Sequence, residues 1–235
     1  MAGRITRKEL KTDKFALEVE QTVDFVTAHR RELIRYGSIA VVVIVLAAGG
    51  YFYSRRQQTV REQALADAIQ IQEAPVEPPN PTVLISFPTD AAKTAAAIKG
   101  FSEVDARYSG SGEATVAEYY LGAIFADQGK MADAEKWFRK AAGGSEKNYA
   151  SLARFSLAQV YFVEGRSADA EKILRDFMQH PTVFVSSEQA TIALARGIAP
   201  TRPAEARKLI EPLRLKAGAV SEVAINAYSD LPGQQ

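Results

Sequence analysis

Residues that catalyse reactions or bind metal ions are few in this chain and far apart. The sequence has no cysteine and two histidines, at positions 29 and 180. Thiol nucleophiles, disulfides and cysteine-ligated metals are therefore excluded, and neither His29 nor His180 has a second histidine nearby to share a metal ion. The segment 109–112 (SGSG) lacks the strand, turn and helix around a nucleophilic serine, so we expect a flexible joint. We predict that the chain is not an enzyme and needs no cofactor or metal.

The charged residues also indicate no nucleic-acid or substrate site. The 29 basic and 28 acidic residues nearly cancel, whereas a nucleic-acid binder concentrates positive charge on one face. Glycine-rich phosphate loops and acidic triplets with metal spacing are missing from the sequence. Asp133, Glu135, Asp169 and Glu171 are expected to be solvated charges on helix surfaces. We therefore predict neither a nucleic-acid partner nor a small-molecule substrate.

Residues 36–53 (YGSIAVVVIVLAAGGYFY) form an uncharged stretch that is long enough to cross a membrane. As a helix rising about 1.5 Å per residue, these 18 residues would be roughly 27 Å long, close to the ~30 Å hydrocarbon core of a bilayer. Aromatic residues stand at both ends, and Arg35, Arg55 and Arg56 flank the stretch, as is typical of membrane interfaces. We predict a single transmembrane helix over 36–53.

Two kinds of export signal are alternatives to an uncleaved anchor. The 35-residue leader is longer than a usual signal-peptide n-region, and the apolar stretch runs into aromatic residues and arginines rather than a small-residue cleavage site. Residues 29–34 (HRRELI) are similar to a twin-arginine signal, which would send a folded domain with an enzyme partner across the membrane. Eight basic residues precede the stretch and three follow it closely, so the positive-inside rule favours a cytoplasmic N-terminus.

The remaining segments differ in composition. Residues 1–35 are predicted to be a cytoplasmic segment with an amphipathic helix, because apolar residues recur every three or four positions. Residues 54–88 are expected to hold a helix that continues the span and then an extended proline-rich spacer over 75–81. The short apolar segment 82–87 (TVLISF) is expected to pack on the following domain, which we place at 89–235.

This domain repeats itself at an interval of 36 residues. Residues 129–136 (GKMADAEK) match residues 165–172 (GRSADAEK). A weaker third copy surrounds Ala206, and a half-copy precedes the others at 97–101. Such self-similarity is the signature of a repeat architecture.

Each copy is predicted to be a pair of helices. In the first copy one helix covers 114–127, Gly129 makes the turn, and the second helix covers 132–142. The small residues Gly122 and Ala134 let the two helices approach closely. Because one pair cannot bury its apolar stripe alone, successive pairs must stack into a solenoid. The predicted fold class is all-α.

Two resemblances follow from these motifs. Leu121-Gly122-x-x-Phe125 with Ala134-x-x-x-Phe138 resembles the tetratricopeptide repeat pattern. The resemblance implies that the single transmembrane helix is followed by a tetratricopeptide-like helical-hairpin solenoid. The order of a cytosolic helix, a glycine-bearing span ending in Tyr-Phe-Tyr, a juxtamembrane helix and repeats is similar to the YfgM-type ancillary subunits of the bacterial Sec translocon.

The resemblances imply a site and a role. In tetratricopeptide solenoids the first helices of successive pairs line a concave groove, and the matching positions here are Tyr119, Ala123, Phe155, Gln159 and Phe162. Large rings there suit a protein partner, and the TVLISF segment is an alternative occupant. The resemblance to translocon subunits implies a bacterial inner-membrane protein whose periplasmic domain meets translocon subunits, periplasmic chaperones or exported chains. A scaffold for cell-wall or cell-division machinery, using the same groove, is the alternative.

Overall fold

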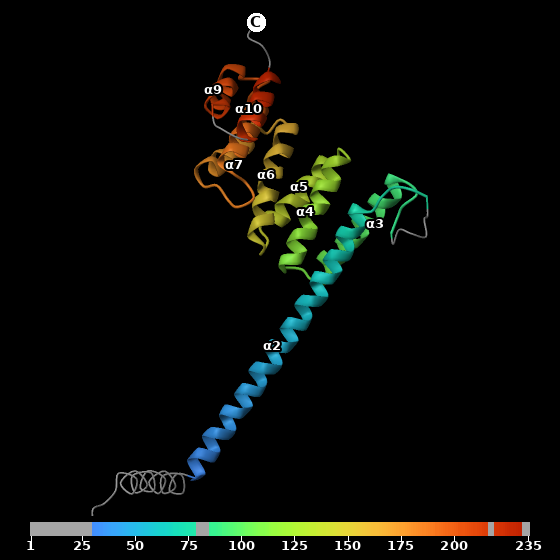
Figure 1. The fold of residues 1–235 in the computed structure, drawn as a ribbon, viewed down its shortest axis with the longest axis vertical. Coiled ribbons are helices and arrows are strands. Elements are labelled where there is room, and N and C mark those ends of the chain that lie inside the picture. The colour runs from blue at the N-terminus through green and yellow to red at the C-terminus, as the bar shows by residue number, and fades with distance from the viewer. Residues whose placement is uncertain (1–29, 79–84, 216–218, 232–235) are drawn as a thin grey trace, which may run out of the picture. The chain divides into compact units, whose positions relative to one another are not determined.

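The computed structural model describes residues 30–78, 85–215 and 219–231, and within these ranges it contains nine helices and no strand (Figure 1). The helices are α2 (Arg30–Glu73), α3 (Asp90–Arg107), α4 (Gly112–Asp127), α5 (Met131–Ala142), α6 (Lys147–Val163), α7 (Ser167–Gln179), α8 (Ser187–Ile198), α9 (Pro203–Arg214) and α10 (Ala219–Ser229). The predicted all-α class and helical-repeat arrangement are confirmed. The amphipathic helix predicted before the span lies almost wholly outside the described residues.

Helix α2 contains the apolar stretch 36–53. It runs without interruption for 44 residues. Its large apolar side chains between Ile39 and Leu46 are all more than half exposed, and an exposed apolar surface of this kind requires a partner other than water. By length and composition α2 could be either a membrane span or a signal sequence.

The compact repeat unit begins at Thr59, within α2, whereas the sequence led us to expect its start at residue 89. Ala68 of α2 is buried in a core that also contains Phe101 of α3. A Cβ built on Gly100 of α3 would lie 3.3 Å from the Ala68 Cβ, so the two helices approach closely. The end of α2 and α3 therefore form a helix pair ahead of the first predicted copy.

Phe87, after the proline-rich segment, is hydrogen-bonded to the start of that segment. The Glu77 N–H donates to the Phe87 carbonyl at 2.9 Å, and the Phe87 N–H donates to the Pro75 carbonyl at 3.1 Å. Val76 and Phe87 thus form an isolated parallel bridge. The start of the spacer is therefore bonded to residue 87, and the Pro75 carbonyl can take part because proline loses its N–H but keeps an acceptor. The rest of the predicted extended spacer lies outside the described residues. The first three residues of the TVLISF segment, 82–84, lie outside the described residues.

Three helix pairs follow α3, namely α4/α5, α6/α7 and α8/α9, and α10 packs against the last pair. Gly129 and Gly165 stand in the turns within the first two pairs with φ of +73° and +77°, a left-handed conformation that glycine adopts without strain. Gly122 permits the predicted close approach, since a Cβ there would lie 2.6 Å from the Phe138 ring.

The core follows the 36-residue interval. Ala134, Ala170 and Ala206 are each fully buried on the second helix of a pair. One turn further, the same positions hold buried larger side chains, namely Phe138, Leu174 and Ile210. The burial of Ala206 and Ile210 confirms that the weak third copy, α8/α9, is structurally equivalent to the others. This stack fixes the first helices α4, α6 and α8 relative to one another.

Candidate protein-binding groove

A cavity of about 470 Å³ opens between α6, α8 and α10. This volume lies within the range of natural binding pockets. Side chains from all three helices line it, among them Phe155, Gln159, Phe162, Ile192, Arg196 and Val223. Because α6 and α8 are the first helices of their pairs, the cavity lies on the side of the repeat unit where the resemblance placed a groove.

The five predicted groove residues divide into two sets. Phe155, Gln159 and Phe162 line this cavity. Tyr119 and Ala123 do not, and they are half-buried on α4 against the main core. By the groove we mean the cavity residues together with the mostly half-buried face of α6 that holds Tyr149, Leu152, Phe155, Gln159 and Phe162. Its use by a partner stays a prediction.

Gly197 shapes the cavity. It stands 36 positions after Tyr161, where the other copies have an aromatic residue. A Cβ on Gly197 would lie 2.2–2.4 Å from three atoms of the Phe162 ring. The missing side chain thus lets Phe162 pack directly on the backbone of α8, which leaves open space beside its ring.

An aromatic strip lies at the start of α6. Tyr149 is in edge contact with Tyr119 of α4 at 5.5 Å between ring centroids, and with Phe184 of the α7–α8 loop at 5.8 Å. Tyr120 stacks on Phe101 at 4.9 Å. Burial, and then the neighbouring Tyr149, raise the pKa of Tyr120 to about 12, so this hydroxyl remains protonated at physiological pH. The strip is an uncharged surface of large rings.

One face of α6 joins the aromatic strip to the cavity. Tyr149, Leu152, Phe155, Gln159 and Phe162 follow one another at intervals of three or four residues, which places them on the same side of a helix. At about 1.5 Å per residue, the path from the first to the last is roughly 20 Å long. The groove is therefore longer than the cavity alone.

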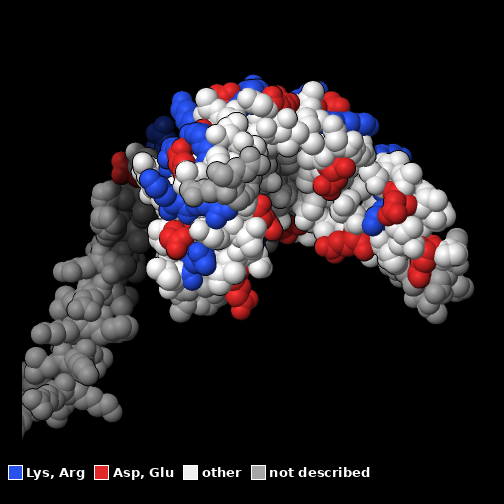
Figure 2. Space-filling view, turned by 90° about the horizontal axis from the view of Figure 1, so that it is seen from above, with Lys and Arg blue, Asp and Glu red and all other residues white. Residues whose placement is uncertain are grey.

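The cavity carries little charge. Arg196 is the one ionisable residue among its lining side chains in the described part of the chain, and its Nη2 lies 3.8 Å from Asp230 Oδ2. Elsewhere on the repeat unit, Figure 2 shows basic and acidic side chains interspersed over the visible face with broad areas of other residues between them. This visible face offers no concentrated charge of one sign for a nucleic acid.

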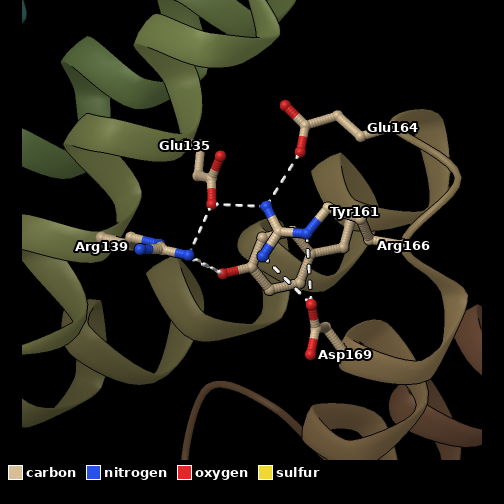
Figure 3. Close-up of polar contacts among 6 residues, drawn as sticks. All are labelled: Glu135, Arg139, Tyr161, Glu164, Arg166 and Asp169. Atoms are coloured by element: carbon tan, nitrogen blue, oxygen red, sulfur yellow. Dashed lines mark hydrogen bonds and ion pairs between the residues drawn. The ribbon is translucent and has the colours of Figure 1, made fainter.

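A polar network holds α6 between its neighbours (Figure 3). Arg166 at the start of α7 donates to Glu135 of α5 at 2.7 Å and to Asp169 at 3.1 Å. Its guanidinium lies 3.9 Å from the centre of the Tyr161 ring, and the Tyr161 hydroxyl accepts from Arg139. The hydrogen bond from Arg166 lowers the pKa of Glu135 although burial opposes it. Two helix pairs are thus tied across their interface.

The charged part of this network recurs 36 residues later, without the tyrosine, because Gly197 takes its place. Arg202 pairs with Glu171 and with Glu205, and Arg175 contacts both carboxylates. Although burial favours the neutral acid, hydrogen bonds from Arg202 and Arg175 lower the pKa of Glu171. The expectation that Glu135 and Glu171 are solvated charges is therefore wrong, because each lies between two arginines from adjacent pairs.

A second recurring pair has its charges exchanged. In the first copy Glu118 of α4 lies 3.2 Å from Lys140 of α5, and in the next copy the same positions hold Arg154 and Asp176, at 2.8 Å. Asp105 of α3 also contacts Lys140, at 2.5 Å. Burial, together with a hydrogen bond to Asp105, raises the pKa of Glu118 to about 7 although Lys140 opposes this. These contacts connect α3 and α4 to α5, and α6 to α7.

No metal-binding cluster is present in the part of the chain that the structure describes. Within it, no group of three or more histidine, cysteine or acidic side chains could hold a metal ion. His180 is exposed, and its Nδ1 lies 3.1 Å from Asp176 of the same helix end. This pair lies on the opposite helix of its repeat from Phe155 and does not line the cavity.

Stacked antiparallel helix pairs with a groove along their first helices define a helical-repeat, protein-interaction class of fold. The family model described as "Tetratricopeptide repeat-like domain" matches residues 32–189. The chain therefore belongs to the tetratricopeptide repeat-like family. Comparisons with curated proteins and with solved structures found no significant match.

Proposed function

We propose that this chain is a membrane-anchored scaffold that binds other proteins in its groove and assists the Sec translocon and periplasmic chaperones with exported chains. The observation that carries the proposal is the cavity between α6, α8 and α10, where the rings of Phe155 and Phe162 line an open space of about 470 Å³. Large rings at such positions bury much area for little loss of rotamer freedom, which is why they anchor partner chains.

The anchor is the apolar part of α2. Its exposed apolar side chains and flanking arginines suit a single span in the bacterial inner membrane. The excess of basic residues before the span favours a cytoplasmic N-terminus and a periplasmic repeat unit. The translocon assignment rests on the similarity of the N-terminal motif, span and repeats to YfgM-type subunits.

Site-specific photo-cross-linking tests the partner. A photoreactive residue in place of Phe155 in the full chain is irradiated in the native cells, and its adducts are identified by mass spectrometry. The control replaces Lys172, which is exposed on α7 and lies outside the cavity. We expect translocon subunits, periplasmic chaperones or exported chains at position 155 and not at 172. Cell-wall or cell-division enzymes at 155 would instead support an envelope scaffold, and no adduct there would refute use of the groove.

N-terminal sequencing of the membrane fraction tests the anchor. We expect residues before the span to be retained in the mature chain. A mature chain that begins after residue 53 and is recovered without membranes would exclude an anchor.

A further inference from the structure

The length of the groove fits a short extended peptide. The face of α6 from Tyr149 to Phe162 is roughly 20 Å long at about 1.5 Å per residue. An extended chain advances about 3.3 Å per residue, so about six residues cover this distance. Apolar rings stand at both ends of the path, at Tyr149 and Phe162, and Phe155 stands between them.

The polar groups of the cavity suit an exposed main chain. Gln159 is exposed, and its side-chain amide has no hydrogen-bond partner among the described residues. Gln189 accepts from the Ser186 N–H through Oε1 at 2.8 Å, which leaves its two amide hydrogens to donate. An extended segment brings unpaired N–H and C=O groups, whereas a helix bonds its own. Amide side chains can therefore pair with the main chain of an extended segment, and they add little to a helix, whose main-chain groups already bond one another.

The charge of the cavity selects against ionised side chains. Its one arginine, Arg196, already lies near Asp230, and its other lining side chains are apolar or amides. A charge buried there without a partner would lose its hydration, which is costly. A partner segment that enters the cavity should therefore be uncharged.

We propose that the groove binds an extended, uncharged, apolar segment of about six residues in a non-native polypeptide, with one large side chain entering the cavity beside Gly197. This inference rests on the proposed function and names the ligand of the same site. The groove thus binds the exported chain itself rather than the folded surface of a chaperone.

Fluorescence anisotropy with synthetic peptides tests this ligand. The probe is a labelled peptide with a six-residue core of valine, leucine and phenylalanine between short soluble ends, and the protein is the full chain in lipid nanodiscs. Two further probes carry an aspartate at the core centre or a backbone locked as a helix. We expect the extended apolar probe to bind at least about tenfold more tightly than either of the other two. Losing one buried apolar contact, or leaving one buried polar group unpaired, weakens binding by about this factor.

The variant Gly197→Ala tests the site within the chain. The added Cβ would lie 2.2 Å from the Phe162 ring, so the ring must swing into the cavity, and we expect about tenfold weaker binding. Gly143→Ala is the control, because its Cβ would meet its nearest neighbour at an ordinary 3.6 Å. If Gly197→Ala does not fold by circular dichroism, Gln159→Leu replaces it and should weaken the extended probe but not the helical one.

Several outcomes would overturn the proposal. Equal or tighter binding of the helical or aspartate probe would show that another ligand class is preferred, and unchanged binding by Gly197→Ala would place the site elsewhere. A position-155 cross-link to a second copy of the chain would identify self-association instead. Absence of peptide binding together with a chaperone or translocon cross-link at position 155 would refute this inference and leave the proposed function standing.

Discussion

Gly122 offers a direct test of the helix packing that builds the repeat unit. In Gly122→Ala the new Cβ would lie 2.6, 2.7 and 2.9 Å from three atoms of the Phe138 ring. Phe138 is almost completely buried, with 2% of its surface exposed, so its ring has no open space to enter. The substitution therefore forces α4 and α5 apart or drives the ring off its rotamer.

The expected size follows from two opposing effects. Alanine in a helix interior is about 1 kcal/mol more favourable than glycine, while overpacking a core costs typically 1–3 kcal/mol. With three contacts below 3.0 Å the overlap lies at the upper end of that range. The net loss is then about 1–2 kcal/mol. For a unit of this size, that corresponds to a fall in Tm of roughly 2–8 °C.

Thermal unfolding of the full chain in nanodiscs, followed by circular dichroism, measures this change. Gly143→Ala is the matched control, because it ends the same helix pair at an ordinary contact distance of 3.6 Å, and its Tm should not fall. Adding Phe138→Leu to Gly122→Ala should recover part of the loss. A Tm that rises in Gly122→Ala alone would refute the close approach of α4 and α5.

Three further predictions concern stability. The raised pKa of Glu118 means that the folded state prefers the neutral acid, so this contribution is complete below about pH 4.5 and is lost as the pH rises through about 7. Between pH 5 and 8 the free energy of unfolding of the wild type should therefore fall more than that of Glu118→Gln, by on the order of 2 kcal/mol. Parallel curves of the two proteins against pH would contradict this. Leu174→Ala should cost about 2–5 kcal/mol in urea unfolding because the side chain is fully buried, whereas Lys172→Ala should be neutral. Arg154→Asp and Asp176→Arg should each cost at most about 1 kcal/mol, since both side chains are partly exposed, and the double variant should recover most of the loss. An additive loss in the double variant would argue against the pair.

The sequence predicted those features that depend on spacing along the chain. The 36-residue interval located the helix pairs, and the predicted helix over 114–127 differs from α4 by two residues at its start. The turn at Gly129 and the close approach at Gly122 follow from residue size and backbone freedom alone. These features are local, or repeat at a fixed distance, and so can be read from one sequence.

Features that depend on partners far apart in the sequence were missed. The end of α2 serves as the first helix of an additional pair, but the connection over 74–89 interrupts the 36-residue interval that would have indicated it. The tie between Glu135 and Arg166 crosses two helix pairs, and residue type alone cannot distinguish a tied carboxylate from a solvated one. A signal was available nevertheless, since both residues recur 36 positions later as Glu171 and Arg202.

The groove itself was predicted in part. Phe155, Gln159 and Phe162 came from their positions in the repeat, and they meet at the cavity. The position of Tyr119 was less predictable, because its ring packs against Tyr149 and Phe138 of neighbouring helices. The role of Gly197 was not predicted, because its effect on Phe162 depends on the distance between α6 and α8.

Photo-cross-linking on two faces of the repeat unit tests the central claim most directly, namely that partners dock along the first helices. One series places a photoreactive residue at Phe155, Gln159 or Val223, which line the cavity. The other uses Lys136, Lys172 and Lys208, which are exposed at one repeat position on α5, α7 and α9. We predict high adduct yields to one set of partners in the first series and background yields in the second. Adducts confined to the lysine series would contradict this.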